Sequence, residues 1–219
     1  MPGIRYCFIF SLFFLTSISH AQIPQHLKRQ VILSDQAIAK ANKYASKVNS
    51  DPVIADKLYQ YAMKEYNKLV QNLAIDQNDS VSMIAYNRLG FLNYYFDSLP
   101  LAKSNYLNAF RLHNKYHFLP DSSLFPSFIF TGSIYYRENM FDSAYYYFKI
   151  AESINDKIKN PLPETQRLYN WLGGMYYETG NYKQAKNYFE KALSILKPSN
   201  PYAKDLAIRY ENNIAAALV

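Results

Sequence analysis

His113 and His117 lie four residues apart, a spacing that places two imidazole rings one turn apart on a helix. Such a pair can bind a single Zn²⁺ ion through two ring nitrogens. A catalytic zinc site needs at least one further protein ligand, and we expect none beside this pair. We therefore interpret the two histidines as side chains at a solvated helix end, and we expect neither a metal site nor another cofactor.

The segment Asp76–Ser80 is a second stretch whose residue types could bind a cation. Its residues offer several oxygen ligands, but it lacks the central Gly and the closing Glu of a calcium loop. A polar turn is the better interpretation. The chain has six Gly, and it shows no glycine-rich phosphate loop, no serine elbow and no metalloprotease motif. We expect no catalytic residues and no enzyme activity.

The N-terminus has the pattern of a signal peptide. Arg5 precedes an apolar run over residues 6–15, and Ser19 and Ala21 then supply small residues at the two positions that a signal peptidase reads. The run is shorter than the ~20 residues of a membrane-spanning helix. We expect residues 1–21 to be removed and the protein to be exported to the periplasm or cell envelope, or secreted.

Cleavage after Ala21 would leave a chain without cysteine, because Cys7 is the single cysteine. Disulfides, thiolate metal sites and thiol nucleophiles are thereby excluded from residues 22–219. The formal charge would fall from +7 to +6, and Lys and Arg are spread along the chain without a cluster. We expect no nucleic-acid partner and no membrane span in the mature chain.

A spaced pattern that occurs three times indicates the elements of the fold. Its glycines, Gly90, Gly132 and Gly173, lie 42 and 41 residues apart. An alanine, an aromatic residue and a second alanine follow each glycine at the same offsets: Ala102, Tyr106 and Ala109, then Ala144, Phe148 and Ala151, then Ala185, Phe189 and Ala192. Each such trio falls on one face of a helix. We expect each glycine to face the first alanine of its own unit, so that two antiparallel helices approach closely.

This pattern resembles the tetratricopeptide repeat, a helix-turn-helix unit of about 34 residues. The resemblance implies an all-α fold, a right-handed superhelical solenoid of antiparallel helix hairpins. Each unit here is seven or eight residues longer, which we interpret as an extra helical turn and a longer connection. Residues 22–219 would form one repeat domain with a degenerate repeat at about 31–75, repeats at about 83–115, 125–157 and 166–198, and a terminal helix at about 204–219.

The resemblance also implies a binding face. In this family the first helices of successive units line the concave side of the solenoid and bind a peptide or partner protein. Large rings, amides and arginines occur at the matching positions, a mixture that suits peptide recognition. These positions are Asn87, Phe91, Tyr94, Tyr95, Ser133, Tyr136, Arg137, Arg167, Asn170, Tyr177 and Glu178.

Two further functions fit the same pattern. The chain could be the sensory or docking front of a larger signalling or protease protein, or a carbohydrate-binding helical repeat protein with aromatic platforms. The apolar end at residues 214–219 could dock on another molecule. We therefore also expect a possible homo-oligomer through the C-terminal helix.

Overall fold

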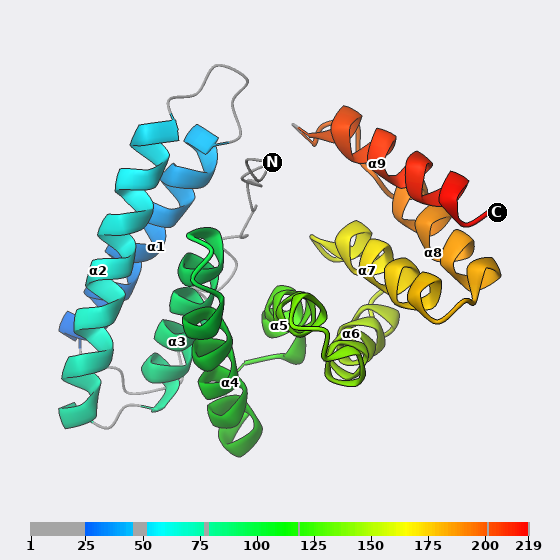
Figure 1. Ribbon diagram of the computed structural model, residues 1–219. Coiled ribbons are helices and arrows are strands. Elements are labelled where there is room, and N and C mark those ends of the chain that lie inside the picture. Colours follow the sequence, from blue (N-terminus) through cyan, green and yellow to red (C-terminus); the bar gives the residue numbers. More distant parts are fainter. Residues whose placement is uncertain (1–24, 46–51, 77–78, 118, 201, 219) are drawn as a thin grey trace. The chain divides into compact units, whose positions relative to one another are not determined.

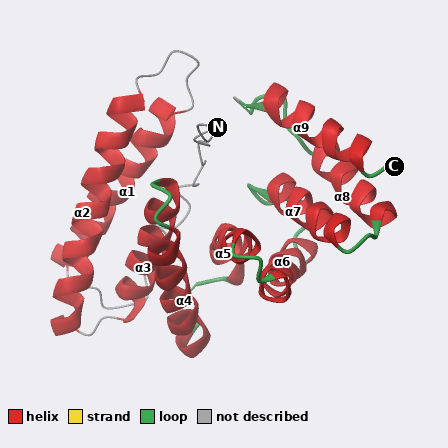
Figure 2. Cartoon of the chain, viewed as in Figure 1, coloured by secondary structure: helices red, strands yellow, loops and turns green. Residues whose placement is uncertain are grey.

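The computed structural model describes residues 25–45, 52–76, 79–117, 119–200 and 202–218. Within these ranges the chain forms α-helices and one short 3₁₀ helix, without a strand, which confirms the all-α prediction (Figures 1 and 2). The expected signal peptide lies outside the described residues, as does the middle of the Asp76–Ser80 turn. None of the described helices is both long enough and apolar enough to cross a bilayer.

The chain divides into two compact units, residues 1–123 and 124–219. In unit 1 each helix packs against the next one along the chain. Its helices are α1 (Gln25–Ala45), α2 (Pro52–Asp76), α3 (Asp79–Tyr95) and α4 (Leu99–Tyr116), followed by the 3₁₀ helix η2 (Asp121–Leu124). Helix α1 begins earlier than the predicted first repeat, because Leu27 and Val31 extend its buried apolar stripe toward the N-terminus.

Unit 2 contains two full hairpins and an additional helix. These are α5 (Phe125–Arg137) with α6 (Phe141–Asp156), α7 (Thr165–Glu178) with α8 (Tyr182–Ser194), and α9 (Ala203–Ala216). Successive helices pack on one another, and α5 also contacts α7 directly. The first helices of neighbouring hairpins therefore lie next to each other, as in a solenoid of stacked repeats.

The second helices carry part of the extra length of the repeats. Helix α4 has 18 residues and α6 has 16, whereas α8 has 13. The connections to the next hairpin supply the rest, and η2 is part of the connection that follows α4.

The three repeat glycines allow an aromatic ring to close on the helix backbone. A Cβ atom built on Gly90, Gly132 or Gly173 would lie 2.5 to 2.6 Å from the nearest ring carbon of Tyr106, Phe148 or Phe189, respectively. The three nearest atoms at each site are ring atoms, so an aromatic ring makes the closest contact with each glycine. The predicted approach of the first alanine to the glycine stays a prediction. The ring four residues after the alanine occupies that space, because it is long enough to reach across the hairpin.

Each first helix of these three hairpins ends in the same left-handed turn. Asp97, Asn139 and Gly180 stand seven residues after the repeat glycines and have φ values of 57°, 58° and 74°. The amide N–H of each donates to the carbonyl three residues earlier, and a second backbone hydrogen bond closes the turn, the Schellman arrangement. The bonds that span five residues are Ser98 N to Asn93 O (2.8 Å), Met140 N to Tyr135 O (2.9 Å) and Asn181 N to Tyr176 O (2.9 Å).

A buried ion pair connects α1 to α3 in unit 1. Arg88 donates from Nε to Asp35 Oδ1 at 2.7 Å and from Nη2 to Asp35 Oδ2 at 3.3 Å. Tyr66, on α2, donates its hydroxyl hydrogen to Asp35 Oδ1 at 2.7 Å. All three side chains are buried, so one carboxylate connects three helices.

Candidate functional site

A groove on unit 2 collects side chains from three successive first helices. It has a volume of about 320 Å³ and is open to solvent. Five of its nine lining residues come from α7, two from α9, and one ring each from α5 and α8, and we call it the α5–α7–α9 groove. The lining residues are Tyr136, Asn170, Trp171, Gly174, Tyr177, Glu178, Phe189, Asn213 and Ala216.

Helical spacing brings the α7 members of this set together. Asn170, Gly174 and Tyr177 follow one another at four and three residues, so they lie on one face of the helix. Gly174 has no side chain, so the middle of that face is open. A Cβ atom there would have only the Tyr136 hydroxyl within 4 Å, at 3.9 Å. The residues of α5 and α9 enter from the neighbouring repeats, since Tyr136 lies 42 residues before Glu178 and Asn213 lies 43 residues after Asn170.

Two hydrogen bonds across the groove join these neighbouring repeats. The Tyr136 hydroxyl donates to Glu178 Oε1 at 3.0 Å, and Asn213 Nδ2 donates to Asn170 Oδ1 at 2.9 Å. Burial, together with the hydrogen bond to Glu178 and its charge, raises the pKa of Tyr136 to about 12. The phenol is therefore protonated at neutral pH and acts as a donor to the carboxylate.

Five lining residues were not among the predicted positions: Trp171, Gly174, Phe189, Asn213 and Ala216. Trp171 has the largest side chain of these. Its ring lies 5.2 Å from the Tyr136 ring and stacks on Phe148 at 6.0 Å, centroid to centroid. It stands two residues before Gly173, at the position that Arg88 and Phe130 hold in the other repeats. A comparison of this one position across the repeats would have drawn attention to the single tryptophan of the chain.

Comparison with known proteins agrees with this architecture. Residues 166–198, which cover most of the α7–α8 hairpin, match the family model of the tetratricopeptide repeat (TPR). Two solved structures resemble nearly the whole chain. BtubC (BKLC) from P. vanneervenii has a TM-score of 0.56 and 16% identity, over 87% of this chain and 91% of that chain. The nearly identical TPR-like repeats of a protein assigned as a kinesin light chain in Podosopora anserina have a TM-score of 0.59 and 13% identity, over 90% and 87%.

This chain has a TPR-like repeat fold, and its residues 166–198 match the TPR family. At these identities the likeness to the two structures concerns the fold alone. The sequence matches none of the curated proteins with which it was compared. TPR-like repeats are generally protein–protein interaction scaffolds and are typically not enzymes.

In unit 2 the structure brings together four of the positions that the TPR resemblance indicated. Tyr136, Asn170, Tyr177 and Glu178 all line the α5–α7–α9 groove. The remaining three predicted residues of unit 2 do not line the groove. Ser133 is buried and donates its hydroxyl hydrogen to Phe130 O at 2.8 Å, Arg167 pairs with Glu164 at 2.8 Å and lies over the Phe130 ring, and Arg137 is exposed at the end of α5.

In unit 1 the corresponding positions are used mainly for packing. Asn87 and Phe91 are buried, so neither side chain is available to a partner at the surface. Tyr95 is half-buried, donates its hydroxyl hydrogen to Asp56 Oδ1 at 2.9 Å and packs against the Tyr59 ring. Tyr94 is half-buried as well. The physical reason is that large side chains on α3 are needed to fill the contact with α2.

The C-terminal apolar end is partly used inside unit 2. Ile214 and Ala217 pack against Ala185 and Phe189 of α8, whereas Leu218 is exposed. This packing reduces the apolar surface that the end could offer to a second molecule. The expected homo-oligomer stays a prediction.

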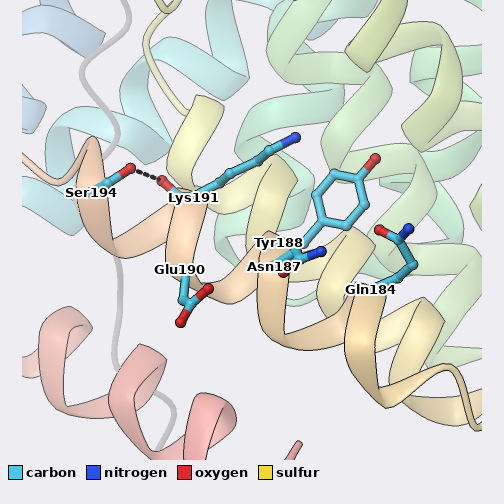
Figure 3. A pocket seen from close by; sticks show the side chains of 6 residues that line it. All are labelled: Gln184, Asn187, Tyr188, Glu190, Lys191 and Ser194. Atoms are coloured by element: carbon cyan, nitrogen blue, oxygen red, sulfur yellow. Dashed lines mark hydrogen bonds between the residues drawn. The ribbon is translucent and has the colours of Figure 1, made fainter.

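A second hollow, of about 410 Å³, lies along α8 (Figure 3). Its six lining residues all belong to this one helix, so it is a shallow surface between side chains. Tyr188 donates to Glu152 Oε1 at 2.6 Å, and the Lys191 ammonium lies 4.9 Å from the centre of the Tyr188 ring. Burial and Glu152 raise the pKa of Tyr188. These groups connect α6 to α8 and thus serve the packing of the repeats.

Proposed function

We propose that this protein is an exported scaffold that binds an extended segment of a partner protein in the α5–α7–α9 groove. The observation that carries the proposal is the convergence of three first helices on one open groove whose lining is part aromatic and part amide. Rings supply contact area at low entropic cost, and amides recognise a peptide backbone.

The amide pair in the groove has hydrogen-bonding capacity to spare. Asn213 uses one N–H to reach Asn170 Oδ1. Among the described residues, neither the Asn170 amide nitrogen nor the Asn213 amide oxygen has a partner. A peptide unit laid across the two side chains can therefore donate to Asn213 and accept from Asn170, a pairing that fixes the direction of the bound segment.

The size of the groove favours a peptide over a folded domain. Small-ligand pockets occupy roughly 300 to 1,000 Å³, and this groove, at about 320 Å³, lies at the lower end of that range. It can take one or two side chains, next to the exposed edge of Tyr177. Additional affinity would come from neighbouring surface of the same unit.

Selection from a displayed peptide library against the purified full chain tests the groove. We expect Asn170→Ala and Tyr177→Ala each to weaken a selected peptide by about tenfold or more, because truncation of an anchor residue commonly costs over 1 kcal/mol. Isothermal titration calorimetry provides the measurement. Asn187→Ala and Tyr146→Ala are matched controls, since these exposed residues lie outside the groove.

Equal binding to wild type and to both groove variants would place the peptide site elsewhere and overturn the proposal. Selection of no peptide, together with retention of an oligosaccharide that Tyr177→Ala abolishes, would favour the carbohydrate-binding alternative.

Export is the second part of the proposal. It rests on Arg5, the apolar run over residues 6–15 and the small residues before Gln22. N-terminal sequencing of the protein isolated from its own cells should give Gln22 as the first residue. An intact Met1 terminus in a soluble extract would contradict it.

A further inference from the structure

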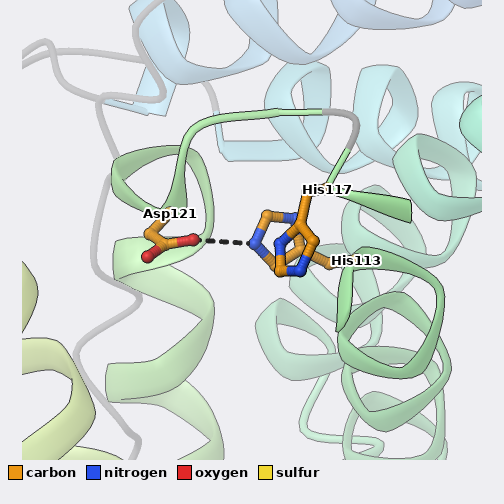
Figure 4. A group of neighbouring side chains, drawn as sticks. All are labelled: His113, His117 and Asp121. Atoms are coloured by element: carbon orange, nitrogen blue, oxygen red, sulfur yellow. Dashed lines mark hydrogen bonds and ion pairs between the residues drawn. The ribbon is translucent and has the colours of Figure 1, made fainter. Parts of the chain in front are cut away.

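Three potential metal ligands meet where α4 ends and η2 begins, within unit 1 (Figure 4). His113 lies in the last turn of α4, His117 is its C-terminal cap, and Asp121 is the first residue of η2. The expectation that no third ligand accompanies the two histidines was wrong. Asp121, four residues after His117 in the sequence, places its carboxylate beside the His113 ring.

The distances within this cluster are close to those around a single ion. His113 Nε2 and Asp121 Oδ1 are 2.9 Å apart, and one ligand atom from each of the three residues lies within 4.8 Å of the other two. Zinc binds nitrogen and oxygen at about 2.0 to 2.2 Å, which places the ligands of one ion roughly 3 to 3.5 Å apart. The 4.8 Å limit is longer than this spacing, so the exposed His117 and Asp121 side chains would move to complete the set.

One ligand of the cluster is buried and the other two are exposed to solvent. His113 is only 3% exposed, and its Nδ1 atom is buried without a hydrogen-bond partner among the described residues. His117 and Asp121 are exposed. An ion held between them would keep positions for water, and the buried ring would supply the ligand that moves least.

His117 adopts a backbone conformation that is uncommon for a residue other than glycine. Its φ is 49°, in the left-handed region, and its amide N–H donates to His113 O at 2.7 Å. A residue with a Cβ atom is less stable in this region than glycine would be. The conformation brings the His117 ring to 5.5 Å from the His113 ring, centroid to centroid.

We propose that His113, His117 and Asp121 bind one divalent transition-metal ion of the Zn²⁺ type. Two imidazole nitrogens and one carboxylate oxygen suit Zn²⁺, Co²⁺ or Ni²⁺ and do not suit Ca²⁺ or Mg²⁺, which take oxygen ligands. The ion connects the end of α4 to η2 and so closes the connection that makes this repeat longer than the standard unit. Its role is to fix that connection.

Titration of the untagged, metal-depleted full chain with Zn²⁺ tests the site by calorimetry. We expect one high-affinity ion per chain, and we expect His117→Ala and Asp121→Ala each to weaken binding by about tenfold or more. His113→Ala is less informative, because loss of a buried side chain can unfold the region. Ca²⁺ should give no comparable heat.

His26, which lies outside the proposed signal peptide and away from the cluster in the sequence, provides a matched control. His26→Ala should bind Zn²⁺ as the wild type does, and Co²⁺ should give a visible absorption band that His117→Ala removes. No stoichiometric binding, or equal binding by wild type and His117→Ala, would overturn the proposal and leave the His113–Asp121 contact as a hydrogen bond only.

Discussion

Arg88 holds a buried charge at a repeat position where the other repeats carry an aromatic ring. The equivalent residues are Phe130 and Trp171, each two residues before a repeat glycine. Burial disfavours the charge on Arg88, but Asp35 and Tyr66 more than offset it, and its pKa lies above the usual value. One position of the repeat thus serves three purposes: an ion pair, a packing ring beneath Arg167, and a groove ring.

We predict that Arg88→Met destabilises the chain by about 3 to 5 kcal/mol, because it leaves Asp35 charged and buried without its partner. The free energy of unfolding from urea titration gives the measurement. The double variant Asp35→Leu with Arg88→Met should recover most of the loss, since both charges are then removed together. A single variant as stable as wild type would show that Asp35 reaches solvent.

The candidate site was predictable in part from single residues. Asn170, Tyr177 and Glu178 fall on the expected face of α7, because helical spacing decides which residues share a face. Asn213 and Trp171 were not predictable in the same way. Asn213 enters the groove only through the packing of α9, and the Trp171 position carries a different residue type in each repeat.

At the scale of the helix, two adjacent glycines in α7 have opposite surroundings. A Cβ atom on Gly173 would lie 2.5 Å from the Phe189 ring, whereas one on Gly174 would meet nothing closer than 3.9 Å. Glycine in a helix costs roughly 0.5 to 1 kcal/mol relative to alanine. The close contact with the Phe189 ring therefore requires glycine at position 173, whereas packing does not require glycine at position 174.

Alanine substitution at these two sites should change stability in opposite directions. We predict that Gly173→Ala destabilises by about 1 to 3 kcal/mol through overpacking, and that Gly174→Ala stabilises by about 0.5 to 1 kcal/mol. Thermal unfolding followed by circular dichroism compares the two. Destabilisation of similar size at both sites would mean that the α7–α8 contact does not distinguish them.

The repeat pattern predicted the elements better than their contacts. The positions of Gly90, Gly132 and Gly173 indicated the three hairpins, because small residues at a fixed offset mark the first helix of each. The offsets could not show which side chain fills the space beside a glycine. That choice depends on the reach of a ring across the hairpin, which three-dimensional packing decides.

At the scale of the whole molecule, tyrosine is the most frequent aromatic residue, with 22 copies. Many of these rings are buried or paired with carboxylates. Burial raises the pKa of Tyr66 and Tyr106 well above the usual value, and that of Tyr147, with neighbouring tyrosines, to about 12. Tyr136 has a pKa of about 12 as well. The fold therefore depends on phenols that stay protonated.

Stability should consequently fall in alkaline solution. In the unfolded chain tyrosine ionises near pH 10, and in the folded chain these phenols hold their protons to higher pH. The unfolded state then binds fewer protons, so the free energy of unfolding decreases as the pH rises from about 10 toward 12. Below pH 10 this contribution is fully present.

Urea unfolding at several pH values, with tyrosinate absorbance as a second signal, measures this dependence. The double variant Tyr136→Phe with Tyr147→Phe should show a shallower decrease between pH 10 and 12, because two of the shifted phenols are gone. An unchanged slope would mean that these two residues ionise in the folded state as they do in the unfolded chain.

Trp171 gives the molecule an optical reporter of its own. It is the single tryptophan of the chain, and it lines the α5–α7–α9 groove beside Tyr136. Fluorescence excited selectively at the indole therefore comes from one known place. Emission changes on adding a ligand report entry into that groove without any label, and the same signal during unfolding follows unit 2 alone while circular dichroism follows both units.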